Sequence, residues 1–265
     1  MENKFTKENF IRIRAEVLQF QLKTLYPVKV GKNPNRVNLV FLNHDRNFST
    51  FLTIRDLAKY DRLADIYALS RSMFESIISM GLLSKYLIVD DIERYQNYQF
   101  IEIYKTYNHL KELGCEHVSG VQPSEVEFIN KKREAYRKKW GKNSQSWTGK
   151  NLLENVKTID DDYPSTYINR HFYEYLYCQV YRKGSQATHS SFGGISIGVN
   201  VEQLSIPGNI LAQRFKVDEA HLIYSCFHSL LVFLSSIRFL GQLLTKKIET
   251  ENYYQKIAMY IISDA

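Results

Sequence analysis

Apolar residues recur every three or four positions along most of this chain, which is the spacing of one face of an α-helix. The pattern is strongest between residues 61 and 87, where its apolar positions are Leu63, Ile66, Leu69, Met73, Ile77 and Met80. A similar stripe in residues 3–25 consists of Phe10, Ile13, Val17 and Phe20, broadened by Ile11, Leu18 and Leu22. Both segments are therefore predicted to be long helices.

The rest of the chain extends this helical pattern. Further helices are expected over residues 39–59, 90–113, 151–158, 165–181, 219–246 and 256–263, and in a basic segment that follows residue 124. Ser124 with Glu127 has the spacing of a capping box for the basic helix. Ser165 or Thr166 is the expected cap of the helix that ends at Tyr181, and Asp218 is the expected cap of the helix over 219–246. Residues 160–166 (DDDYPST) are expected to form a turn, with a solvated acidic run rather than a cation site.

Only residues 195–206 alternate weakly between apolar and polar positions, as an extended segment or a short β-hairpin does. We therefore predict an all-α fold with one multi-helix domain over 1–265. Its expected parts are N-terminal helices in 1–60, a core in 61–195 that carries the candidate motifs, and C-terminal helices in 217–265.

The composition excludes several classes of protein. Hydrophobic residues make up 44% of the chain and charged residues 24%, which is typical of a globular protein. The three cysteines form no CxxC pair, and the first residues contain no apolar stretch like that of a signal peptide, so a cytoplasmic location is expected. Neither a P-loop nor a GxGxxG motif is present, and no cofactor or metal is expected.

One apolar stretch has to be weighed as a membrane span. Residues 222–237 contain no formally charged side chain, but they include His228 and four serines. The stretch is shorter than the roughly 20 residues that cross a bilayer. It is therefore expected to be a central helix of the core, with no membrane among the partners.

The net charge is +7, and the excess is concentrated in one segment. Its basic residues are Lys131, Lys132, Arg133, Arg137, Lys138, Lys139 and Lys142, against the single acid Glu134. Tyr136 and Trp140 lie four residues apart within it, on one face of a helix. One interpretation is a stripe that binds RNA or another polyanion and stacks bases on the two aromatic rings. The other is a solvated helix whose two rings pack on the core.

The segment YRKGSQATHSSFGG, residues 181–194, offers candidate chemistry. If a helix continues through Gly184, Arg182 and His189 are nearly two turns apart on one face, about 10 Å along the axis, with Ser185 between them. If Gly184 breaks the helix, Ser185 caps a new one. In either case Arg182 is expected to neutralise a phosphate, His189 to transfer a proton and Ser185 to orient the phosphate. Cleavage of RNA by its own 2′-hydroxyl needs little more.

A second pair of charged residues lies in the strongly apolar helix 61–87. Arg71 and Glu75 are four residues apart, so they either pair with each other at the rim of the core or serve another buried group. In the functional interpretation, Glu75 with Arg71 supports the imidazole of His189 from the neighbouring helix.

These segments also carry a family resemblance. RSMFES with its aliphatic continuation, then WTGKN, then YLYCQVYRKGSQATHSS, resemble an uncharacterised bacterial all-helical family of unknown function with an Arg-x-x-x-Glu helix and a Tyr-x-x-x-Ser-x-x-x-His segment. The match covers roughly residues 55–195. The Arg182–His189 pair is also similar to the motif of HEPN ribonucleases, dimeric helical enzymes of toxin–antitoxin, abortive-infection and CRISPR systems.

The HEPN resemblance implies a helical bundle and a metal-independent endoribonuclease of phage defence or a toxin system. Arg182 and His189 would take the motif positions in a composite site across a homodimer or higher homo-oligomer, with a cognate regulator protein as a further partner. Two alternatives stay open: a non-catalytic binding or sensor module that uses the same pocket, and a scaffold whose polar residues only organise the core.

Overall fold

The computed structural model of the chain describes residues 6–25, 34–85, 89–141, 146–163, 171–189, 219–244 and 250–262. Within these residues the secondary structure is helical and contains no strand, which confirms the predicted all-α fold. The expected extended piece at 195–206 and the expected caps Ser165, Thr166 and Asp218 lie outside the described residues.

The contacts within the chain divide it into two compact units. Unit 1 comprises residues 1–85 and 156–265, and unit 2 comprises residues 86–155. The prediction of one domain over the whole chain stays a prediction.

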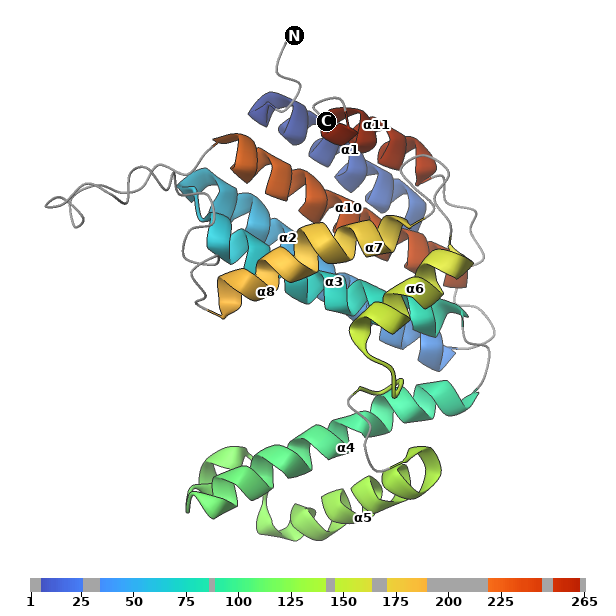
Figure 1. The fold of residues 1–265 in the computed structure, drawn as a ribbon. Helices are drawn as coiled ribbons and strands as arrows, with labels where there is room; N and C mark the ends of the chain where they lie inside the picture. The colour runs from blue at the N-terminus through green and yellow to red at the C-terminus, as the bar shows by residue number, and fades with distance from the viewer. Residues whose placement is uncertain are drawn as a thin grey trace, which may run out of the picture. The chain divides into compact units, whose positions relative to one another are not determined.

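Unit 1 is built around a long apolar helix, α10 (Glu219–Leu243). It packs against α2 (Pro34–Leu57) and α3 (Leu63–Lys85), which also pack against each other, and against α1 (Lys7–Leu25) and α11 (Glu251–Ile262). A short 3-10 helix, η1 (Ala58–Tyr60), follows α2. Figure 1 shows these helices gathered around α10.

The helix α10 is the one described helix long and apolar enough to cross a membrane, and 83% of its most apolar window is buried inside the protein. Phe233 of α10 lies parallel to Phe51 of α2 with the ring centroids 4.8 Å apart. The predicted central core helix is therefore observed, because the apolar surface of α10 is covered by neighbouring helices.

The apolar stripe of α3 faces the core as predicted. Its buried positions include Leu63, Ile66, Met73, Ile77 and Met80, while Leu69 is only half-buried. The stripe of α1 is narrower than expected: Phe10, Ile13 and Val17 are buried. Ile11 and Leu22 are 44% and 61% exposed, because they lie on the side of α1 that faces away from α10.

A continuous helical run leads to the candidate motif. It consists of α7 (Phe172–Leu176), the π-helix η3 (Tyr177–Arg182) and α8 (Lys183–Thr188). The predicted helix thus continues beyond Tyr181, and the alternative in which Gly184 breaks it is excluded. Both η3 and α8 pack against α3.

Unit 2 is a pair of helices, α4 (Val89–Glu112) and α5 (Pro123–Trp140), joined through the 3-10 helix η2 (Glu116–Ser119). The capping box of α5 uses Gln122 and Glu125 rather than the predicted Ser124 and Glu127. The reason is Pro123, which has no N–H and starts the helix two residues earlier than predicted.

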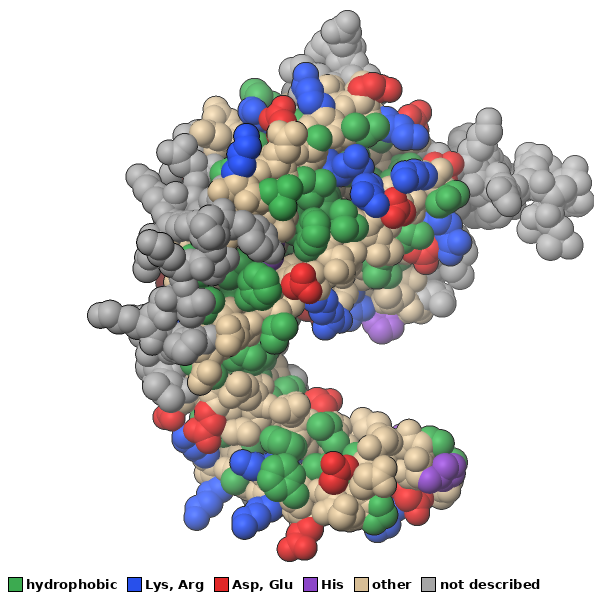
Figure 2. Space-filling model, turned by 180° about the vertical axis from the view of Figure 1, so that it is seen from behind, with side chains coloured by type: hydrophobic (Ala, Val, Ile, Leu, Met, Phe, Trp, Pro, Cys, Tyr) green, Lys and Arg blue, Asp and Glu red, His purple; other side chains and the backbone are tan. Residues whose placement is uncertain are grey.

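Figure 2 shows hydrophobic and charged side chains interspersed over the surface.

The acidic run at 160–162 is helical rather than a turn, because it forms the end of α6 (Leu152–Asp162). Asp160 is 3% exposed, so the expectation of a fully solvated run is wrong for this residue.

Two histidines of unit 1 are buried and uncharged near neutral pH. Burial lowers the pKa of both His44 and His228 to about 4. In the unfolded chain a histidine has a pKa near 6.5, so the unfolded state binds more protons between about pH 4 and pH 6.5. Their contribution to stability is therefore present above pH 6.5 and is lost as the pH falls toward 4.

Asp160 acts in the opposite direction, because burial raises its pKa to about 6 and its contribution is lost as the pH rises through that value. At about 1.4 kcal/mol per pKa unit, the two histidines outweigh the one carboxyl. We expect the free energy of unfolding to fall by on the order of 2 kcal/mol between pH 7 and pH 5. Urea unfolding at the two pH values measures this loss, and equal stability at both would contradict the burial of neutral histidines.

Candidate functional site

The predicted motif residues lie on the described part of α8 and at its two ends. Arg182 and His189 are exposed and Ser185 is half-buried. The backbone N–H of His189 donates to the carbonyl of Ser185 at 3.1 Å, an ordinary α-helical bond. Because helical geometry holds from Arg182 to Thr188, Arg182 and His189 share one side of the helix, about 10 Å apart along its axis.

Arg71 connects α3 to the last turn of α8. Its Nη1 donates to Thr188 Oγ1 at 2.8 Å, and its Nε donates to Glu75 Oε1 at 3.1 Å. The guanidinium also lies 5.0 Å from the ring centroid of Tyr181. Three partners therefore hold Arg71, and one of them immediately precedes His189.

The expected direct support of His189 by Glu75 is not observed. Among the described residues Glu75 bonds to Arg71 and makes no hydrogen bond with His189. The connection from α3 to His189 instead runs through Thr188, whose hydroxyl also donates to the carbonyl of Ser185 at 3.0 Å. Arg71 and Glu75 thus pair with each other, as in the alternative interpretation, while Arg71 also contacts the motif helix.

Gly184 allows α8 to approach α3 closely. A Cβ atom added at this position would lie 2.5 Å from the carbonyl oxygen of Tyr67 and 2.6 Å from Cβ of Arg71. No residue with a side chain fits there without moving one of the two helices. The glycine in the middle of the motif is therefore a packing contact and not a helix break.

The π-helix η3 ends at Arg182. Within it Tyr177 stacks on Tyr181 with the ring centroids 5.0 Å apart, and both rings also lie beside Phe74 of α3. Short π-helical segments inside α-helices are frequent at functional sites. Here the segment fixes the orientation of Tyr181, the aromatic partner of Arg71.

A buried polar network lies between the motif run and α10. His228 Nδ1 donates to the carbonyl of Tyr224 at 2.8 Å, which leaves Nε2 to accept from the Tyr175 hydroxyl at 2.7 Å. Lys183 Nζ lies 5.4 Å from the ring centroid of Tyr224, and burial lowers the pKa of this lysine. This network secures the motif run to α10.

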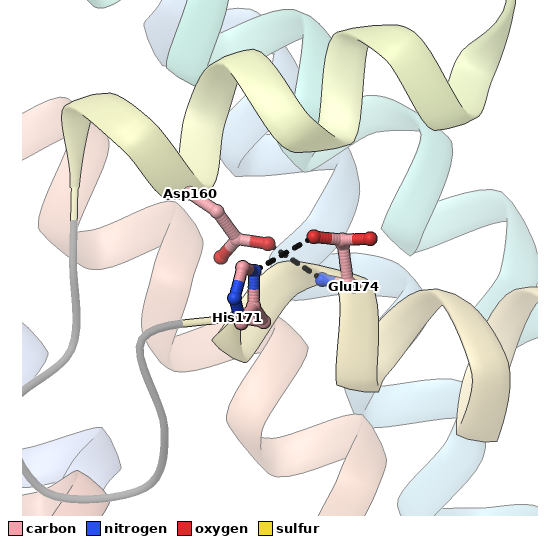
Figure 3. Close-up of side chains that lie close together, drawn as sticks. All are labelled: Asp160, His171 and Glu174. Atoms are coloured by element: carbon pink, nitrogen blue, oxygen red, sulfur yellow. Dashed lines mark hydrogen bonds and ion pairs between the residues drawn. The ribbon is translucent and has the colours of Figure 1, made fainter.

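Among the described residues, Asp160, His171 and Glu174 form a cluster whose ligating atoms are close enough to hold a metal, all within 4.8 Å of one another (Figure 3). The two carboxylate oxygens of Asp160 accept the backbone N–H groups of Tyr173 and Glu174 at 2.7 and 2.8 Å. His171 Nδ1 lies 2.8 Å from Glu174 Oε1. Each group has a partner without a metal, so the cluster is explained as a cap that α6 places on the start of α7.

The basic helix α5 uses its aromatic residues internally. Tyr136 is 1% exposed and contacts the rings of Tyr98 and Trp140 at 5.9 and 4.8 Å. The predicted base stacking on Tyr136 is therefore wrong, because its ring is covered by α4 and its own helix. Trp140 is half-buried, with Lys139 Nζ 4.7 Å from its ring centroid.

Several cations of α5 are compensated by acids. Lys139 lies 2.9 Å from both Asp90 and Glu93, and Arg133 and Arg137 both pair with Glu134. In the described part of the chain no ion pair engages the exposed side chains of Lys131, Lys132 and Lys138. These three lysines are the cations of the described part of α5 that pair with no acid, and polyanion binding by this helix stays a prediction.

The sequence did not identify Thr188 or Tyr181 as partners of Arg71. The sequence spacing could have identified them, because positions 181, 184 and 188 follow the i, i+3, i+7 pattern of one helix face. An arginine that is half-buried in the strongly apolar helix α3 requires partners from a packed neighbour, and this face supplies two of them.

A family model described as a family of unknown function (DUF5677) matches residues 37–203, more than half of the chain. The matched range includes Arg71, Glu75, Arg182, Ser185 and His189. No curated protein and no solved structure matches the chain.

Proposed function

We propose an activity for this chain, which belongs to DUF5677, a family of unknown function. The proposed activity is cleavage of RNA, at a site on α8. Membership in an uncharacterised helical family confirms the first resemblance seen in the sequence. The HEPN resemblance stays a proposal, as do a cytoplasmic location and a role in phage defence or a toxin system.

One observation carries the proposal: α8 presents Arg182 and His189 to solvent on one side, while its other side is fixed to α3 through Gly184 and Thr188. Exposure makes both side chains accessible to a phosphodiester. The packed side limits the movement of the helix, and a catalytic group needs such a rigid support.

In the proposed reaction, Arg182 contacts the non-bridging oxygens of the scissile phosphate with its forked donors. His189 takes the proton of the 2′-hydroxyl, the 2′-oxygen attacks phosphorus, and the bond from phosphorus to the 5′-oxygen breaks. The leaving 5′-oxygen receives a proton from a second His189, supplied by a second copy of the chain. Ser185 orients the phosphate, and Arg71 fixes the end of α8 through Thr188.

The experiment is incubation of the protein with RNA in EDTA, followed by analysis of the product ends. The proposed reaction leaves a 2′,3′-cyclic phosphate and a 5′-hydroxyl. Other end groups, or an absolute need for a divalent metal, would remove this mechanism.

A non-catalytic binding module is the second candidate. It is favoured by one observation: among the described residues, no carboxylate hydrogen-bonds to the imidazole of His189, as an orienting group does in many proton-transfer sites. Binding of RNA by the wild-type chain without cleavage would support this candidate.

RNA binding should also depend on the uncompensated lysines of α5. Lys138→Ala removes a cation with no acidic partner among the described residues, so we expect weaker binding and a salt slope reduced by about one unit. Lys139→Ala is the matched control, since Asp90 and Glu93 already compensate that charge. Titrations at several salt concentrations measure both slopes, and equal effects of the two substitutions would contradict this assignment.

A further inference from the structure

The face of α5 that carries the uncompensated lysines also carries an exposed aromatic ring. Phe128 is 54% exposed and is the one phenylalanine among the exposed large hydrophobic side chains of the described residues. It packs edge to face with Phe100 of α4, with the ring centroids 5.7 Å apart and the planes at 86°. The ring is therefore anchored on one side and remains open to solvent over about half of its surface.

The lysines extend along the helix from this ring. Lys132 Nζ is 5.6 Å from the ring centroid of Phe128. Lys131 follows Phe128 by three residues and is its neighbour on the helix surface, and Lys138 follows Lys131 by seven, so it continues the row of Lys131 two turns further along the helix. We call Phe128, Lys131, Lys132 and Lys138 the Phe128 face. It extends over about 15 Å of the helix axis.

The other cations of the helix do not belong to this face. Arg133 lies 3.7 Å from the ring centroid of Tyr104 and pairs with Glu134, and Lys139 pairs with two acids of α4. The lysines that no acid pairs with in the described part of α5 thus form a row that begins beside Phe128, the one exposed aromatic ring of this part of the helix. In Figure 2, Lys and Arg side chains adjoin hydrophobic ones on the surface of unit 2.

We propose that the Phe128 face binds single-stranded RNA, with Phe128 stacked on an unpaired base and the three lysines contacting the phosphates. An aromatic ring beside a row of cations is the usual arrangement of single-strand binding surfaces. A base within a duplex is already stacked on its neighbours and cannot offer its face to a side chain. The choice of RNA rests on the proposed function, whereas the choice of a single strand rests on Phe128.

The test measures binding rather than cleavage, so the two proposals fail separately. Fluorescence anisotropy of a labelled, unstructured RNA is recorded with the full-length chain carrying His189→Ala, which prevents loss of the probe. Phe128→Leu keeps an apolar residue but removes the ring, and we expect about tenfold weaker binding of the single strand. Phe128→Tyr keeps the ring and should bind within about twofold of the parent.

A duplex RNA of the same length is the control ligand, and it should bind more weakly with no response to Phe128→Leu. Equal affinity of the Leu variant and its parent for the single strand would overturn the proposal, as would an equal response of the duplex. Since Phe128 is half-exposed, circular dichroism should show unchanged folding of both variants. Ring-dependent binding by a wild-type chain that does not cleave would retain the Phe128 face and reject the ribonuclease.

Discussion

Replacing His189 with alanine is expected to lower the rate of RNA cleavage by about 10²–10⁴-fold, the usual loss when a general acid–base group is removed. His189 lies at the exposed end of α8, so the substitution removes the proposed proton carrier without opening a cavity. A single-turnover cleavage assay at neutral pH measures the rate. The melting temperature should stay unchanged.

His109→Ala is the matched control for this prediction. His109 is also exposed and helical, but it belongs to α4 of unit 2, and its Nδ1 lies 4.0 Å from Glu112 Oε2. The His109→Ala variant should cleave RNA at the wild-type rate. Full activity of the His189 variant would exclude His189 as the proton carrier and favour the binding module.

Gly184→Ala is expected to destabilise the protein by about 1–3 kcal/mol and to abolish cleavage, because the added methyl group overpacks the contact between α3 and α8. The new Cβ would meet the backbone oxygen of Tyr67 at 2.5 Å, and backbone yields less easily than a side chain. Alanine gains up to about 1 kcal/mol in helix propensity over glycine, so a net loss shows that the clash dominates. Urea unfolding measures the change.

Gly81→Ala provides the comparison within the same fold. Gly81 is also buried and helical, but a Cβ there would meet the side-chain atoms Cδ1 of Ile159 and Cζ of Phe239, at 2.7 and 2.9 Å. These atoms can shift by rotation of their side chains, so a smaller loss is expected with cleavage retained. A Gly184 variant as stable and active as the wild type would contradict the proposed support of α8.

The sequence predicted the helices well where apolar spacing alone determines them. In α3 the spacing of Leu63, Ile66, Met73 and Ile77 identifies a helix and its buried side. The capping box of α5 was misplaced because several residues near Pro123 can serve as caps and only the backbone geometry selects one. The exposure of Ile11 and Leu22 was missed because an apolar stripe does not reveal how much of it a neighbouring helix covers.

The candidate site was predicted in part. The positions of Arg182, Ser185 and His189 followed from helical spacing, which is a local property of the sequence. The bond between Arg71 and Thr188 joins residues 117 positions apart, and local spacing contains no information about such a contact. The burial of Tyr136 was equally non-local, because it depends on the ring of Tyr98 in α4.

The most direct measurement of the central claim is a double-mutant cycle with Arg182→Ala, His189→Ala and both together, read as single-turnover rates of RNA cleavage in EDTA. If the two side chains act as a unit on one phosphate, the double variant should be no slower than the slower single variant. Cleavage by the double variant at the wild-type rate would show that α8 does not carry the reaction.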